Sequence, residues 1–91
     1  MATKKNKIQL YYNEVGRLIK KYRQEKKLTL EQLGFEVGLN KSDIFNIEKG
    51  KNITILTLLK IALVLEKDII VFFDFKNPVK KEDLDSLIKS K

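Results

Sequence analysis

Apolar positions recur at helical spacing through the first part of the chain. Over residues 12–26, apolar side chains three and four positions apart form one stripe, and charged side chains cover the other side. This pattern predicts a first helix, preceded by a polar, basic arm over residues 1–11. Gly16 lies inside the predicted helix, where it costs about 1 kcal/mol relative to Ala. A close approach to a neighbouring helix would explain a glycine at this position.

Two short helices joined by a tight turn are predicted over residues 29–50. Thr29 and Gln32 form a capping-box signature before the first of them, and Gly38 has the place of a left-handed residue after its end. Asn40 is a suitable N-cap for the second helix. Two short helices joined this tightly are typical of a helix-turn-helix, in which the second helix enters the DNA major groove.

The chain changes character after a fourth predicted helix. Residues 55–65 are apolar around most of the helix, which predicts the most buried element. Residues 69–75 are β-branched and aromatic without a helical period, which predicts a strand; a short helix capped by Asp68 is the competing interpretation. A lone strand has no partner in its own chain, so it implies pairing with its twin in a homodimer. The expected interface residues are Ile69, Val71, Phe72, Phe73 and Phe75.

The predicted domain organisation follows from these elements. A single domain covers residues 12–75, with a dimerisation segment over residues 68–75. Asn77-Pro78 is predicted to break the chain, and residues 76–91 are predicted to form a polar tail or a marginal helix. The expected fold class is mainly α, a compact domain of four to five helices with a C-terminal, dimer-forming β-strand.

Composition removes several classes of function. The chain has no cysteine and no histidine, so it lacks a disulfide framework, a thiolate metal site, the commonest general base and the commonest zinc ligand. No apolar run approaches the roughly 20 residues of a membrane-spanning helix, and the basic N-terminus lacks the apolar segment of a secretory signal. We expect a cytoplasmic protein that is not an enzyme and has no cofactor, no metal and no membrane partner.

Positive charge is concentrated at one end of the chain. The net charge is +7, and residues 1–27 hold nine Lys and Arg against two Glu, whereas residues 28–75 hold five Lys against seven acids. A basic small protein indicates a polyanionic partner, although Lys-rich faces can also be merely solvated. Long-range attraction would come from the first helix and arm, and position-specific contacts from the middle of the chain.

Several spaced motifs resemble those of a known family. These are VGRLIKKYR (15–23), LTLEQLG (28–34), VGLNKSDI (37–44), IEKG (47–50) and TLLKIALVL (57–65). Together they resemble the Cro and phage-repressor helix-turn-helix family, also called XRE-type regulators. The resemblance implies a repressor-type DNA-binding fold and a homodimer on a palindromic operator. It places the second helix at Leu30–Val37 and the reading helix at Lys41–Lys49.

The resemblance also assigns roles to single residues. Base contacts are expected from the start and outer face of the reading helix, namely Asn40, Lys41, Ser42, Phe45 and Asn46. Asn pairs with adenine, Lys donates to guanine, and an apolar side chain contacts the thymine methyl group. Asn40 and Ser42 have the alternative role of caps, and Phe45 that of packing on a partner. Phosphate contacts are expected from Thr29, Gln32, Lys49, Lys51 and Asn52.

Four further positions can be compared with the family pattern. Arg23 and Glu48 match a salt bridge that orients the reading helix. Leu30 occupies a position where the family often has Gln, so one expected side-chain contact to phosphate is missing. Gly34 stands where Ala is common, which weakens the second helix but leaves room for a close crossing with the third.

Double-stranded DNA and a second copy of the chain are therefore the expected partners, and a repressor is the leading function. The C-terminal part resembles HipB-type antitoxins, which would add a toxin protein as partner. Restriction–modification controller proteins have a similar size but usually continue as helix beyond the fourth helix. These alternatives remain open on the sequence.

Overall fold

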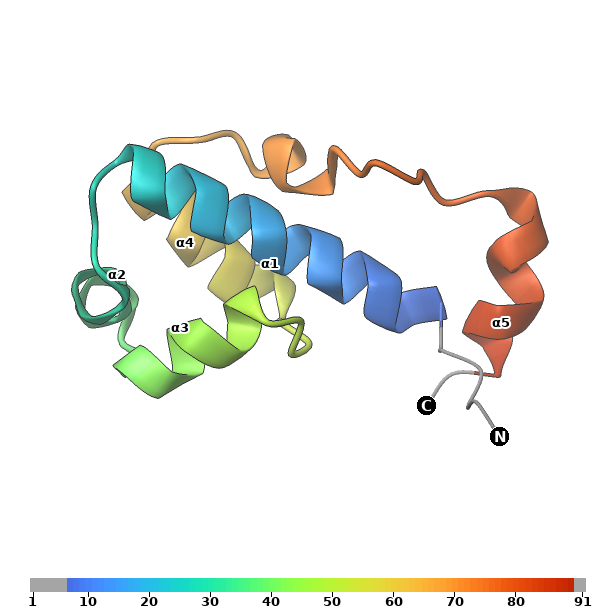
Figure 1. Cartoon of the computed structure of the whole chain (residues 1–91), viewed down its shortest axis with the longest axis horizontal. Helices are drawn as coiled ribbons and strands as arrows, with labels where there is room; N and C mark the ends of the chain where they lie inside the picture. The colour runs from blue at the N-terminus through green and yellow to red at the C-terminus, as the bar shows by residue number, and fades with distance from the viewer. Residues whose placement is uncertain (1–6, 90–91) are drawn as a thin grey trace.

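The long helix α1 (Lys7–Glu25) is the element around which the others pack in the computed structural model, which describes residues 7–89 (Figure 1). The remaining elements are α2 (Leu30–Val37), α3 (Lys41–Glu48), α4 (Ile55–Leu65), the 3-10 helices η1 (Ile69–Phe73) and η2 (Lys81–Asp83), and α5 (Leu84–Ile88). Over this described range, none of the helices is long and apolar enough to cross a membrane.

Side-chain caps fix where the short helices begin. Thr29 Oγ1 accepts a hydrogen bond from the Gln32 amide at 3.0 Å, and Gln32 Oε1 accepts one from the Thr29 amide at 2.8 Å. Thr54 caps α4 in the same way through the Thr57 amide. These bonds satisfy first-turn donors that have no partner inside a helix. The capping box predicted for α2 is thereby confirmed.

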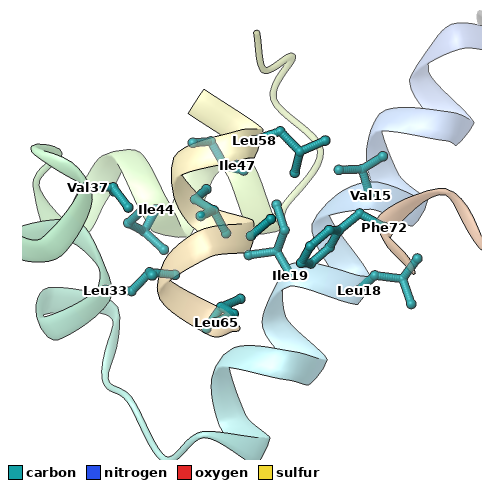
Figure 2. Close-up of a cluster of buried hydrophobic side chains, with 12 residues drawn as sticks. Val15, Leu18, Ile19, Leu33, Val37, Ile44, Ile47, Leu58, Leu65 and Phe72 are labelled. Atoms are coloured by element: carbon teal, nitrogen blue, oxygen red, sulfur yellow. The ribbon is translucent and has the colours of Figure 1, made fainter. Parts of the chain in front are cut away.

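The core lies between α1 and the α2–α3–α4 layer. Its buried side chains come from five elements and point toward one another (Figure 2): Val15, Leu18, Ile19, Leu33, Val37, Ile44, Ile47, Leu58, Ile61, Ala62, Leu65 and Phe72. Four members belong to α4, but the expectation that this helix is the most buried element holds for one side only, because Leu56, Leu59 and Leu63 are exposed. This core holds the backs of α2 and α3, so their polar faces point outward.

The prediction of a strand over residues 69–75 was wrong, because residues 7–89 contain no strand. The segment forms η1, as in the competing interpretation: Asp68 Oδ1 accepts from the Ile70 amide at 3.1 Å. In a 3-10 helix, residues three apart lie on one side, so Ile69 and Phe72 both face the core. Phe72 is 0% exposed, and its ring meets that of Tyr22 edge to face at 5.7 Å. Burial inside its own chain removes the need for a partner strand.

The N-terminal boundary of the domain also differs from the prediction. Helix α1 begins at Lys7, inside the expected arm of residues 1–11, of which residues 1–6 lie outside the described range. The chain after η1 runs back along α1 to its N-terminal end, where α5 packs (Figure 1). There the Tyr11 hydroxyl donates to Asp83 at 2.7 Å, and the Tyr11 ring stacks on Phe75 at 5.3 Å. In this segment residues 76–82 are exposed, Asp83 is buried against α1, and Leu84–Ile88 form a short helix, as in the marginal-helix alternative; residues 90–91 lie outside the described range.

Candidate nucleic-acid interface

The turn between α2 and α3 brings two backbones into contact. A Cβ added at Gly34 would lie 2.5 Å from the carbonyl oxygen of Leu39, closer than real Cβ contacts allow. The Leu39 amide donates to the Gly34 carbonyl at 2.8 Å, and Gly38 completes the turn with φ of 78°. A left-handed residue at this place closes the end of α2. Glycine at position 34 therefore serves the close crossing that the sequence predicted.

A second close approach joins α1 to the end of α3. A Cβ added at Gly16 would lie 2.5 Å from the carbonyl oxygen of Ile47 and 2.6 Å from that of Glu48. The cost of a glycine inside α1 is thus offset by direct contact between the two helix backbones. This contact fixes how far α3 stands from α1.

An ion pair between α1 and α3 fixes the orientation of the same helix end. Arg23 Nε and Nη2 donate to the two carboxylate oxygens of Glu48 at 2.6 and 3.1 Å, and Arg23 Nη1 donates to the Leu28 carbonyl at 2.8 Å. The two side chains are only 10% and 5% exposed. A two-pronged bond between planar groups restrains direction as well as distance. The pair expected from the family pattern is therefore present.

The outer face of α3 carries the residues predicted to contact bases. Lys41, Ser42 and Asn46 are exposed, and Phe45 is 47% exposed. The opposite face, with Ile44 and Ile47, is buried. The structure thus places these four side chains on one solvent-facing surface of a helix whose back is fixed in the core.

Asn40 begins α3 and has a defined role as a cap. Its Oδ1 accepts from the Asp43 amide at 2.8 Å, while Asp43 Oδ2 accepts from the Asn40 amide at 3.2 Å. The capping bond occupies the oxygen of the Asn40 side-chain amide. The NH₂ group of the same amide carries the donors that could bind a base edge or a phosphate. The alternative of a capping role for Asn40 is therefore observed. It is compatible with a base contact.

The predicted phosphate-binding residues lie at both ends of the α2–α3 unit. Thr29 and Gln32 are exposed at the start of α2, and Lys49, Lys51 and Asn52 are exposed directly after α3. Lys49 Nζ stands 5.4 Å from the centre of the Phe45 ring, a cation–π arrangement. Lys49 also lines a hollow together with Leu30, so it lies near the start of α2.

Gln9 and Asn13, which sequence analysis did not single out, support the loop after α3. Gln9 Nε2 donates to the Gly50 carbonyl at 2.9 Å and to Asn13 Oδ1 at 2.8 Å. Gly50 has φ of 108°, a left-handed conformation that favours glycine. Gln9 was assigned to the arm because no apolar stripe reaches it, so no pattern signalled this contact.

The residues predicted to form the dimer interface differ in exposure. Phe72 is in the core, and Ile69, Val71 and Phe75 are partly buried against it, so Phe73 is the one with substantial exposure. Another apolar surface lies on α4, where residues at helical spacing are exposed. We call this the α4 surface: Leu56, Leu59 and Leu63, with Leu63 76% exposed.

The chain was compared with known proteins. A family model described as helix-turn-helix (HTH_3) matches residues 19–72, more than half of the chain. The HTH-type transcriptional regulator SlrR of Bacillus subtilis (strain 168) is 36% identical over 62 residues, which cover 66% of the chain and 41% of that regulator. The matched part is thus less than half of SlrR.

A solved structure is similar over a larger share of its own length. The crystal structure of the restriction-modification controller protein C.AhdI from Aeromonas hydrophila matches with a TM-score of 0.65 and 28% identity. The match covers 68% of the chain and 96% of C.AhdI. Together with the family model, it confirms the resemblance of the α1–α4 region to repressor-type proteins.

Proposed function

The chain belongs to the XRE-type helix-turn-helix family, and we propose that it is a DNA-binding transcriptional repressor that binds a palindromic operator as a homodimer. The observation that carries this proposal is the outer face of α3. Its polar side chains are exposed, while the Gly16 contact and the Arg23–Glu48 pair hold the helix in one orientation. A helix held in this way can enter the major groove without rearrangement.

Base recognition is assigned to five residues. Lys41 suits the two acceptors of guanine, Asn46 suits the donor and acceptor of adenine, and the Phe45 ring suits the methyl group of thymine. Ser42 adapts to either donor or acceptor, and Asn40 uses the NH₂ group of its capping side chain. Such contacts carry the sequence information.

Phosphate contacts are assigned to the two flanks of α3. The exposed α2 start supplies Thr29 and Gln32, and the segment after α3 supplies Lys49, Lys51 and Asn52. Phosphate contacts fix the position and orientation of the protein along the DNA. They also make affinity fall with salt, because bound cations are released from the DNA.

The dimer is assigned to the α4 surface together with the exposed side of η1. Leu56, Leu59 and Leu63 recur at helical spacing and are exposed, as is Ile70 in η1, which packs against α4. Apolar side chains gathered at a surface mark a protein interface. A two-fold axis there would present two copies of α3 to half-sites about 34 Å apart.

The second candidate is a controller protein of a restriction–modification operon, which regulates its own transcription. The similarity to C.AhdI over 96% of that chain favours it. The helical form of residues 69–73 also agrees with it. The strand on which the resemblance to HipB-type antitoxins rested is absent from residues 7–89.

A gel-shift assay with duplexes selected for binding tests the reading role of α3. The double variant Lys41→Ala, Asn46→Ala removes two base contacts, each worth about 1–3 kcal/mol. We expect discrimination between operator and random duplex to fall about 30-fold or more, with an unchanged melting curve because both residues are exposed. A matched control is Lys81→Ala with Asn77→Ala, the same residue types in the C-terminal segment. Full operator specificity in the α3 variant would refute the assignment.

A further inference from the structure

A hollow at the junction of α1, α2 and α3 is lined in part by a lysine that was not predicted to contact DNA. It has a volume of about 150 Å³ and is lined by Lys20, Arg23, Leu30, Phe45, Glu48 and Lys49. Lys49 was predicted to bind phosphate from its place in the sequence. Lys20 was not, because in the sequence it is one of several lysines on the solvated side of the first helix.

The charge balance of this hollow is positive. Arg23 and Glu48 neutralise each other through their two hydrogen bonds and are almost fully buried. Lys20 and Lys49 are exposed, so the hollow presents two ammonium groups to solvent. It can therefore attract an anion without competition from an unpaired carboxylate in its lining.

Two of the residues that line the hollow, Leu30 and Phe45, are apolar. Leu30 is partly buried beside the core, and Phe45 has its ring under the Lys49 ammonium at 5.4 Å. A low-polarity surface beside a cation strengthens its attraction for an anion, since field lines are focused there. A phosphodiester offers both an anionic oxygen for the ammonium groups and a sugar for the apolar walls.

We propose that Lys20 and Lys49 together bind one phosphate of the DNA backbone at this hollow. The proposal rests on the DNA-binding function proposed above and extends it. In the family pattern a Gln at position 30 contacts phosphate from α2, and Leu30 cannot do so through its side chain. Lys20 on α1 supplies a charged contact at the same place, so the phosphate is bound from α1 and α3 instead of α2.

The salt dependence of DNA binding tests this proposal. Each phosphate contact contributes about 0.9 to the slope of log affinity against log salt concentration. Lys20→Ala is expected to lower that slope, by at most about 0.9 because Lys49 remains at the same phosphate, and to weaken binding to operator and random duplexes by the same factor. Lys20→Arg, which keeps the charge, should retain the slope.

Lys21→Ala is the matched control. It removes the same charge from the next position of α1, where the Lys21 ammonium lies over the Tyr22 ring at 5.2 Å instead of in the hollow. Its slope should remain that of the wild type. A Lys20→Ala slope equal to that of Lys21→Ala would overturn the proposal. If the wild type itself shows no salt-dependent binding to any duplex, the proposed function fails, which is a different and distinguishable result.

Discussion

Gly16 lies where the backbone of α1 touches the carbonyl groups at the end of α3. The sequence showed only that a glycine interrupts an otherwise good helix, and the structure supplies the reason. Ala at this position would gain about 1 kcal/mol of helix propensity. It would also place a methyl group 2.5 Å from the Ile47 oxygen, which belongs to backbone and cannot turn aside.

Gly16→Ala is therefore expected to destabilise the domain. Overpacking costs about 1–3 kcal/mol, and a clash with backbone belongs to the upper part of that range, so a net loss of about 2 kcal/mol is expected after the gain in propensity. Urea unfolding followed by circular dichroism measures the free energy of unfolding. Gln24→Ala, at an exposed position of the same helix, should change it by at most about 0.5 kcal/mol. A Gly16→Ala variant as stable as the wild type would show that α1 and α3 can separate freely.

At the level of single residues, short-range signals were the most predictable. The caps Thr29 and Asn40 act within one helical turn, so their roles follow from neighbouring letters of the sequence. The Arg23–Glu48 pair joins distant positions and was predicted only through the family pattern. The Gln9 contact with Gly50 is also long-range, but no motif carries it, and sequence reasoning could not find it.

At the level of elements, the segment after α4 shows where local pattern fails. Residues 69–73 have the composition of a strand, and composition alone gives them no reason to be helical. Tertiary packing decides: Phe72 enters a site beside Tyr22, and Asp68 caps the turn. The depth of that site depends on α1, which lies far away in the sequence.

The C-terminal segment forms an equally non-local contact with the start of α1, with Asp83 at its centre. Asp83 accepts from the Lys80 amide at 3.0 Å and the Tyr11 hydroxyl at 2.7 Å, and pairs with Lys7 at 3.4 Å. The Lys7 amide donates to Ser86 Oγ at 3.3 Å. We infer that this contact keeps the first turns of α1 helical and so holds Gln9 against the loop after α3.

Asp83→Asn should loosen the first turns of α1. The amide loses the negative charge that pairs with Lys7 and can accept with only one oxygen. Hydrogen exchange measured over residues 7–13 is expected to accelerate. Asp85→Asn, which removes the same charge at an exposed position of α5, should leave that exchange unchanged. Equal protection in both variants would mean that Asp83 does not support α1.

The same carboxylate predicts a pH dependence. The hydrogen bonds from the Lys80 amide and the Tyr11 hydroxyl, with Lys7 nearby, hold the pKa of Asp83 below its ordinary value of 3.8. A lowered folded-state pKa means that the charged form favours folding, so this contribution is present above pH 3.8 and is lost as pH falls through the lower, folded-state pKa. The chemical shift of the Lys80 amide should titrate with a midpoint below 3.8. A midpoint at or above 3.8 would contradict these contacts.

At the level of the whole molecule, the question is how two copies meet. The fold class, mainly α with a helix-turn-helix, was predictable because amphipathic periods and caps are local. The interface between two copies remains a proposal, and of the five residues predicted for it only Phe72 is fully buried in the core of its own chain. The α4 surface became visible only once the core showed which apolar residues of α4 were left outside.

The proposed dimer is expected to dissociate in the variant Leu63→Glu, because the substitution places a charge in the α4 surface. Analytical ultracentrifugation measures the mass in solution. Phe35→Glu, a matched change at an 81% exposed position of α2, should leave the dimer intact. A dimer that survives Leu63→Glu would show that the two copies meet elsewhere.

In the function proposed above, α3 reads a specific DNA sequence as part of a symmetric dimer. Selection of bound duplexes from a random pool, with the wild-type protein, tests it most directly. We predict enrichment of a palindrome whose half-sites are one helical turn apart, about 34 Å between centres, with the enriched bases lost for Lys41→Ala, Asn46→Ala. A pool that remains random after repeated rounds, or a motif unchanged in that variant, would contradict the account.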